Sequence, residues 1–258
     1  MNKNTSELWD ALWEDPSYRS SDLYHLNKEN FGIRWKRIEK KILDEYGSFD
    51  GLQIAEVGSG VGKVAALCAK RGANVSLIDY SSGALNRSAE FYSRLGIRAE
   101  MKQMDVLTVP QDMAECFDVV MSFGLTEHFT GQERIHSNRS HFQLVRPGGL
   151  VFIAVPNRYN PPYRLYKAIA ELTGTWRYGE EYPYSRSEFK RICESIGVRN
   201  YDFTGDSFWD SFRFLNPLGN FRKAFGFNPR YETGTFLDAY ISYSLVLVAK
   251  KPIDTPIL

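Results

Sequence analysis

The sequence predicts an α/β protein with a doubly wound, mainly parallel sheet of seven strands. Short apolar runs alternate with helical segments between residues 52 and 155, an alternation typical of parallel βαβ units. The first run ends at Val57 and leads through a glycine-rich turn, residues 58–62, straight into a helix. Acidic residues, Asp79 and Asp105, close the next two runs. Because parallel strands end at one edge of a sheet, these features predict a ligand site at that edge.

Each strand is an apolar run, and each helix shows apolar residues at steps of three or four. The predicted strands are 52–57, 74–78, 99–104, 117–123, 150–155, 199–203 and 241–249. The helices between them begin near 61, 82, 130 and 185. Gly72 and Gly96 end the first two, an Arg-Pro-Gly-Gly turn at 146–149 ends the third, and Ser185 with Glu188 forms a capping box for the fourth.

The first 47 residues form a separate predicted segment, followed by a core from 48 to 258. Residues 1–22 are largely polar and contain two tryptophans, Trp9 and Trp13, and we interpret them as a lid or a docking tail. An amphipathic helix closed by Gly47 follows. Its apolar face comprises Phe31, Trp35, Ile38, Ile42 and Tyr46. Its other side carries Arg34, Lys36, Arg37, Lys40 and Lys41, interpreted as a solvated face, with an acidic partner as the alternative.

Whole-chain properties bound the function. The chain has 258 residues, a formal net charge of +1 and 3 cysteines. This length suits one sizeable α/β domain with additions, and the small charge argues against a nucleic-acid substrate. Cys68, Cys116 and Cys193 are scattered without a C-x-x-C pair, as expected of core residues in a reducing compartment. The polar start and the absence of a bilayer-length apolar run predict a cytoplasmic protein.

The turn at 58–62 follows Glu56 in the pattern acid-x-G-x-G-x-G. A dinucleotide fingerprint would need a third glycine where Lys63 stands. The pattern instead resembles the first motif of class I S-adenosylmethionine-dependent methyltransferases. The resemblance implies a Rossmann-like sheet with an antiparallel last strand. It also implies S-adenosyl-L-methionine as cofactor, S-adenosyl-L-homocysteine as product, and a turn that wraps the methionine end of the cofactor.

Two acids complete the predicted cofactor site. Asp79 lies about 20 residues beyond the glycines, the distance at which a carboxylate reaches a ribose, although it could instead cap the helix near Ser82. Tyr80 could cover the adenine, and the resemblance assigns Asp105 to the adenine amino group. The predicted cofactor-binding residues are Glu56, Gly58, Ser59, Gly60, Gly62, Asp79, Tyr80, Met104, Asp105, Val106 and Ser122.

His128 is the candidate catalytic residue, as a base or as a group that orients the substrate, because histidine titrates near neutral pH. The alternative is a structural histidine tied to the backbone or to Glu127. Some quinone-type O-methyltransferases bind a divalent metal through an acid three residues before a Glu-His pair. That position is Gly124 here, so no metal site is predicted. His136 and His141 have the wrong spacing for a shared site, and nothing favours His25.

Two long connections, 157–184 and 204–240, are predicted to hold the methyl acceptor. Both are rich in aromatic residues, which suit either a small core under a lid or an apolar acceptor pocket. The rings are Tyr159, Tyr163, Tyr166, Trp176, Tyr178, Phe208, Trp209, Phe212, Phe214, Phe221, Phe225 and Phe227. Peripheral membrane contact is an alternative, because Arg213, Arg222, Lys223 and Arg230 are interleaved with them. A homodimer also stays open.

The leading hypothesis is therefore a methyltransferase acting on an oxygen or nitrogen atom of a small apolar or aromatic molecule. The basic face of the helix at 31–46 motivates an RNA or protein methyltransferase as an alternative. A cofactor-binding scaffold without activity is a third hypothesis, since no catalytic base is certain. A nicotinamide oxidoreductase ranks last, because Lys63 replaces the third glycine and no Tyr-x-x-x-Lys follows the fourth strand.

Overall fold

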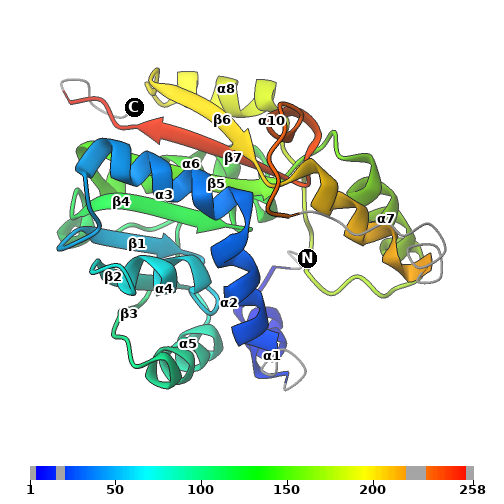
Figure 1. Cartoon of the computed structure of the whole chain (residues 1–258), viewed down its shortest axis with the longest axis horizontal. Helices are drawn as coiled ribbons and strands as arrows, with labels where there is room; N and C mark the ends of the chain where they lie inside the picture. The colour runs from blue at the N-terminus through cyan, green and yellow to red at the C-terminus, as the bar shows by residue number, and fades with distance from the viewer. Residues whose placement is uncertain (1–3, 16–20, 219–230, 254–258) are drawn as a thin grey trace.

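The computed structural model describes residues 4–15, 21–218 and 231–253, and in residues 215–218 the backbone alone. Its sheet has 7 strands in the order β3-β2-β1-β4-β5-β7-β6 (Figure 1). The strands are β1 (Gln53–Val57), β2 (Asn74–Asp79), β3 (Glu100–Gln103), β4 (Phe117–Phe123), β5 (Val145–Pro156), β6 (Tyr201–Gly205) and β7 (Ser244–Lys250). Strands β1 to β5 pair in parallel, and β7 is antiparallel to both of its neighbours. The doubly wound sheet with an antiparallel last strand is confirmed.

Helices cover both faces of this sheet. They are α1 (Ser6–Glu14), α2 (Asp22–Phe31), α3 (Ile33–Tyr46), α4 (Lys63–Ala69), α5 (Ser82–Leu95), α6 (Gly131–Leu144), α7 (Pro161–Leu172), α8 (Arg186–Ser195) and α10 (Asp238–Ile241), with 3-10 segments η2 (Gln111–Met113), η3 (Thr126–His128) and η4 (Phe208–Leu218). One apolar cluster joins the sheet to α3, α4 and α5, and the other joins it to α6 and α8. The two cores fix the strand ends that build the site.

The predicted helix at 31–46 is divided at Gly32. Phe31 ends α2 and is 54% exposed, so its assignment to the apolar face was wrong. Trp35, Ile38 and Ile42 are buried as predicted. The predicted basic face is largely neutralised within the chain. Arg34 pairs with Glu29 and Asp206, Arg37 with Asp238, and Lys40 with Asp44.

The starts of two strands differ from the prediction by three residues or more. β5 begins at Val145, so residues 146–149 belong to the strand and form no separate turn. The pairing of β4 with β5 shifts register between Phe117 and Val119, which accommodates this irregular entry. At the other end of the chain, Ile241 belongs to α10 and β7 begins at Ser244. Local apolar pattern alone does not separate a short helix from the strand after it.

The two long connections, 157–184 and 204–240, are called the first and second insertions below. Their described parts pack on each other beyond the carboxyl ends of the parallel strands, where Figure 1 shows α7. The ring of Tyr163 in α7 lies 5.6 Å from Phe214 of η4 and 5.1 Å from Tyr243. Described rings therefore form a small core of their own. Phe221, Phe225, Phe227, Arg222, Lys223 and Arg230, named above for a pocket or a membrane contact, lie outside the described residues. Within the described residues, every helix is too short or too polar to cross a membrane.

Candidate functional site

The turn between β1 and α4 depends on three glycines in the left-handed region, with φ of 60° at Gly58, 51° at Gly60 and 68° at Gly62. A Cβ on Gly62 would lie 2.7 Å from the Leu77 side chain, and one on Gly60 would lie 2.6 Å from the ring of Trp13. Only glycine satisfies both the backbone angles and these close approaches. The turn thus brings bare backbone to the edge of the sheet.

The acids at the strand ends are held by backbone N–H groups. Asp79 accepts hydrogen bonds from Gly60 N at 2.8 Å and from Ser81 N at 2.9 Å. Burial raises the pKa of Asp79, while these hydrogen bonds oppose the rise. Asp105 accepts a hydrogen bond from Leu107 N at 2.8 Å. Each carboxylate is therefore fixed before any ligand arrives, and the lone pairs that these bonds do not use can face the pocket.

A pocket of about 330 Å³ lies at the carboxyl ends of β1, β2 and β3. It brings together many of the predicted cofactor residues and the predicted catalytic one. These are Gly58, Asp79, Tyr80, Met104, Asp105, Val106 and His128. Residues from three strand ends and from η3 thus share a single cavity, as the positions of the acids in the sequence predicted.

Two other predicted cofactor residues, Glu56 and Ser122, do not line this pocket. Glu56 points into the fold, where its Oε2 accepts a hydrogen bond from Ala65 N at 2.7 Å, and burial raises its pKa to about 8. Ser122 is buried against α6, with its hydroxyl 2.8 Å from Nε2 of His141. Both face away because side chains alternate along a strand. Glu56 anchors the start of α4 behind the glycine turn, and Ser122 belongs to the core.

The N-terminal helix α1 forms the opposite wall of the pocket. Trp13 packs on Gly60, so the backbone of Gly60 is covered by the ring. Trp9 lies edge-on to His128, with ring centroids 4.8 Å apart. Asn4 donates hydrogen bonds to the carbonyls of His128 at 3.0 Å and Glu180 at 3.2 Å. The pair of tryptophans indicated a lid in the sequence, but no local signal pointed to Asn4.

His128 is a half-buried, neutral histidine in this structure. Its Nδ1 lies 2.8 Å from the carbonyl oxygen of Glu180. A carbonyl only accepts, so Nδ1 carries the proton and Nε2 carries the lone pair. Burial lowers the pKa of His128 to about 4. The expected titration near neutral pH is therefore not found, and His128 accepts hydrogen bonds across the neutral range.

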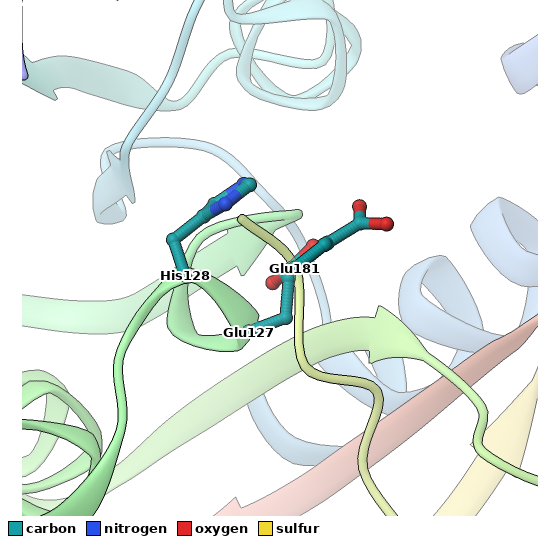
Figure 2. Close-up of side chains that lie close together, drawn as sticks. All are labelled: Glu127, His128 and Glu181. Carbon is teal, nitrogen blue, oxygen red and sulfur yellow. The ribbon is translucent and has the colours of Figure 1, made fainter. Parts of the chain in front are cut away.

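Two carboxylates accompany His128. Ligand atoms of Glu127, His128 and Glu181 all lie within 4.8 Å of one another (Figure 2). Burial and the nearby Glu181 raise the pKa of Glu127, and burial raises the pKa of Glu181 to about 6. The hydroxyl of Tyr163 donates to Oε2 of Glu181 at 2.5 Å. Glu181 and Tyr163 belong to the first insertion, and nothing in the local sequence connects them to Glu127.

A second, wider cavity of about 970 Å³ separates α1 from the end of the first insertion. Leu8 and Leu12 of α1 line one side, and Trp176 and Glu181 line the other. Its walls combine apolar surface with the same carboxylate that approaches Glu127. This cavity offers room for a second molecule beside the first pocket.

Comparison with known proteins relates the chain to methyltransferases. Residues 54–149 match the family model of a methyltransferase domain. The ubiquinone biosynthesis O-methyltransferase of Sinorhizobium fredii is 25% identical over 221 residues, which cover 81% of this chain and 84% of that protein. The protein of the same name from Pseudomonas fluorescens is 32% identical over 157 residues, covering 61% of this chain and 62% of the relative, less than two thirds of it.

Solved structures support the fold. The magnesium protoporphyrin IX methyltransferase of Synechocystis, solved with bound SAH, has a TM-score of 0.58 at 13% identity and covers 97% of this chain and 95% of its own. A structure from a study of echinomycin biosynthesis, on the conversion of a disulfide bond into a thioacetal group, has a TM-score of 0.59 at 17% identity, covering 87% of this chain and 83% of its own. At these identities the likeness extends to the fold alone.

Proposed function

Because the chain belongs to the class I S-adenosylmethionine-dependent methyltransferase superfamily, we propose that this methyltransferase acts on a hydroxyl oxygen of a small apolar or aromatic molecule. The choice of oxygen is supported by the relatives, which are named as O-methyltransferases. We also propose that it works in the cytoplasm.

One observation supports the cofactor assignment above all others: Gly58, Asp79 and Asp105 line a single pocket. S-adenosylmethionine, when bound, supplies a sulfonium that donates a methyl group. Asp79, fixed by two N–H groups, would accept the ribose hydroxyls, and Asp105 would accept the adenine amino group. Tyr80 and Val106 would flank the adenine ring. The donor set fits the group, because adenosine presents hydroxyl and amino hydrogens to carboxylates.

The acceptor would enter from the cavity between α1 and the first insertion. This cavity joins apolar side chains to the neighbourhood of His128, whose backbone carbonyl is bound by Asn4. The neutral His128 would accept a hydrogen bond from the acceptor hydroxyl and orient its oxygen. Holding that oxygen about 3 Å from the methyl carbon, in a site from which α1 excludes water, is the main contribution the protein must make.

Calorimetry with S-adenosylmethionine and S-adenosylhomocysteine tests the cofactor site. We expect micromolar binding by the wild type and at least tenfold weaker binding by Asp79→Ala, equivalent to about 1.4 kcal/mol. Asp112→Ala removes an exposed carboxylate on η2 and serves as the matched control. Undiminished binding by Asp79→Ala would remove Asp79 from the site.

A panel of phenols, other alcohols and amines, followed by mass spectrometry, tests the reaction. The expected product is the methyl ether of a hydroxyl-bearing acceptor, which is heavier than the acceptor by one CH2 unit. It should form together with S-adenosylhomocysteine. Methylation of amines alone would overturn the choice of oxygen. Cofactor binding without turnover of any acceptor would favour the inactive scaffold. The RNA alternative is less favoured, because three of the five basic side chains on this face, Arg34, Arg37 and Lys40, pair with acids of the chain.

A further inference from the structure

We propose that the ring of Trp13 occupies the place of the cofactor's methionine end on the glycine turn, so that the cofactor must displace this ring to bind. The inference rests on the proposed cofactor site and extends it from the adenosine contacts to the methionine end. In this role Trp13 opposes binding, whereas a lid residue would add contacts to the bound cofactor. The two roles predict changes of opposite sign when the ring is removed.

The ring of Trp13 fills the space that the missing side chain of Gly60 leaves open. A Cβ on Gly60 would lie 2.6 Å from both Cη2 and Cζ2 of the ring. A glycine in such a turn lets a ligand approach the backbone closely, and here the ring has taken that position. Trp13 also lines the pocket that contains Asp79 and Asp105. A ligand that reached Gly60 from this pocket would therefore overlap the ring.

Charged side chains beyond the turn indicate why a ligand has to pass this point. Gly58 lines the pocket at one end of the turn, and Lys63, the first residue of α4, lines a further cavity of about 410 Å³. Arg34 and Glu29, which pair with each other, line that cavity too. Side chains of both signs suit the carboxylate and the ammonium group of the methionine end. A cofactor that reached from the pocket to this cavity would run along Gly60.

The helix that carries Trp13 is docked only at its surface. Every residue of α1 remains at least partly exposed, and the helix has only 9 residues. A helix of this length is marginal on its own, so its contacts with the rest of the chain decide where it lies. Trp13 lies in its last turn, and the ends of a helix open at a lower free-energy cost than its middle. The ring can therefore leave the turn without unfolding the core.

Arg87 of α5 gives the ring a defined position. Its guanidinium carbon lies 5.5 Å from the centroid of the Trp13 ring, and its Nη1 donates a hydrogen bond to the Trp13 carbonyl at 3.4 Å. Asp22 fixes Arg87 in turn, accepting a hydrogen bond from Nη2 at 2.8 Å. Both of these charged residues are buried. The attraction between the cation and the ring stabilises the arrangement in which Trp13 covers Gly60.

Other anchors of α1 do not involve the ring. Asp10 accepts hydrogen bonds at the start of α5. Asn4, just before α1, donates one to the Glu180 carbonyl. These contacts can persist when Trp13 leaves Gly60, so α1 can still cover the bound cofactor. The displacement of one ring is thus compatible with the exclusion of water proposed above.

Calorimetry with two ligands tests this role in the full-length protein. S-adenosylhomocysteine carries the methionine end, whereas adenosine lacks it and needs only the pocket beside Asp79 and Asp105. We expect Trp13→Ala to bind S-adenosylhomocysteine about fivefold to tenfold tighter than the wild type, because no ring has to be displaced. Its affinity for adenosine should stay within about twofold. Glu14→Ala, which changes an exposed neighbour on the same helix, is the control and should match the wild type with both ligands.

Fluorine NMR of protein labelled with 5-fluorotryptophan locates the ring directly, and the dispersion of the other signals shows that each variant is folded. The chain has 5 tryptophans, and the signal missing from Trp13→Phe belongs to Trp13. S-adenosylhomocysteine should shift this signal toward that of solvent-exposed tryptophan. Adenosine should leave it in place.

The outcomes separate the role of the ring from the cofactor site itself. Unchanged or weaker binding of S-adenosylhomocysteine by Trp13→Ala would overturn the inference, as would a Trp13 signal that moves away from the solvent-exposed position. Equal gains in affinity for both ligands would also overturn it, because the effect would not depend on the methionine end. If neither the wild type nor Trp13→Ala bound either ligand, the proposed cofactor site would be wrong, and the inference would fall with it.

Discussion

The site has two regions, which we call the proposed adenosine side (Asp79 and Asp105) and the η3 side (Glu127 and Glu181). Their carboxyl groups lie in opposite kinds of environment. Asp79 accepts hydrogen bonds from Gly60 and Ser81, and Asp105 accepts one from Leu107. On the other side, Glu127 and Glu181 face each other, and one oxygen of Glu127 has no partner within the described residues. The first region is complete as folded. In the second, two carboxyl groups lie close together, and burial raises the pKa of both.

This difference indicates where each region obtains its stability. The glycine turn is fixed by backbone bonds and steric contacts within consecutive βα units, so changes there should cost folding energy. The acid pair opposes folding, and removing one charge should lower that cost. The following predictions test this contrast.

Gly62→Ala should produce the largest effect. The alanine would have to adopt the left-handed backbone conformation of Gly62, with φ of 68°. Its Cβ would also lie 2.7 Å from the buried Leu77 side chain. Strain of about 1–2 kcal/mol and overpacking of about 1–3 kcal/mol combine to a loss near 3 kcal/mol in the free energy of unfolding. Chemical denaturation measures this loss.

Gly96→Ala is the matched control for that variant. Gly96 has a similar φ of 66°, but a Cβ there would meet nothing within 4 Å. The free energy of unfolding of Gly96→Ala should therefore fall by the backbone strain alone, about 1 kcal/mol. Equal losses in the two variants would show that close packing behind the glycine turn contributes little.

Substitution of one carboxylate by its amide should have opposite signs in the two regions. In Asp79→Asn, one backbone N–H loses its acceptor, and unfolding free energy should fall by about 1–3 kcal/mol. In Glu127→Gln, measured with a chelator present, the repulsion with Glu181 disappears and the amide can donate to it. Stability should then rise by about 1 kcal/mol. A fall in both variants would contradict the contrast.

The stability contributed by Glu56 should depend on pH. Burial raises the pKa of Glu56 in the folded state to about 8, from its ordinary value of 4.5. Between these two pH values the folded state therefore holds a proton that the unfolded state has lost. Unfolding free energy should fall as pH rises through this window, by up to about 1.4 kcal/mol per pH unit. Glu56→Gln should lack this slope. The difference between the two proteins should be constant below pH 4.5, and parallel profiles throughout would refute the assignment.

The sequence predicted that Gly58, Asp79 and Asp105 would lie together, and they line one pocket because their positions follow from the order of the strands. Gly58, Asp79 and Asp105 close consecutive strands, and parallel strands bring their ends together. Glu56 and Ser122 were misplaced because the face of a strand on which a side chain lies depends on register and neighbouring helices.

The η3 side could not be predicted in this way. Glu181, Tyr163 and Asn4 reach it through packing between distant segments. Only Gly124 gave a local signal there, and it argued against a metal. Glu181 lies in the first insertion, and the periodicity of the sequence specifies no contact across that distance.

Helix α1 touches both regions, and its release gives the smallest but most selective test. Oδ1 of Asp10 accepts hydrogen bonds from Gly83 N at 3.0 Å and from the Ser81 hydroxyl at 2.5 Å, so it acts as a cap for α5. Asp10→Ala should therefore weaken the docking of α1 by about 1 kcal/mol. Glu7→Ala, on an exposed position of the same helix, is the control.

Hydrogen exchange can then separate the two regions in the Asp10→Ala protein. The amide of Gly60 should keep its protection, because Asp79 holds it even when Trp13 leaves. The amide of Glu180 should exchange faster, because it donates to Oδ1 of Asn4, which lies just before α1. About fivefold to tenfold faster exchange at Glu180 corresponds to the lost docking energy. Equal acceleration at both amides would mean that the adenosine side also depends on α1, and the proposed independence of the glycine turn would be wrong.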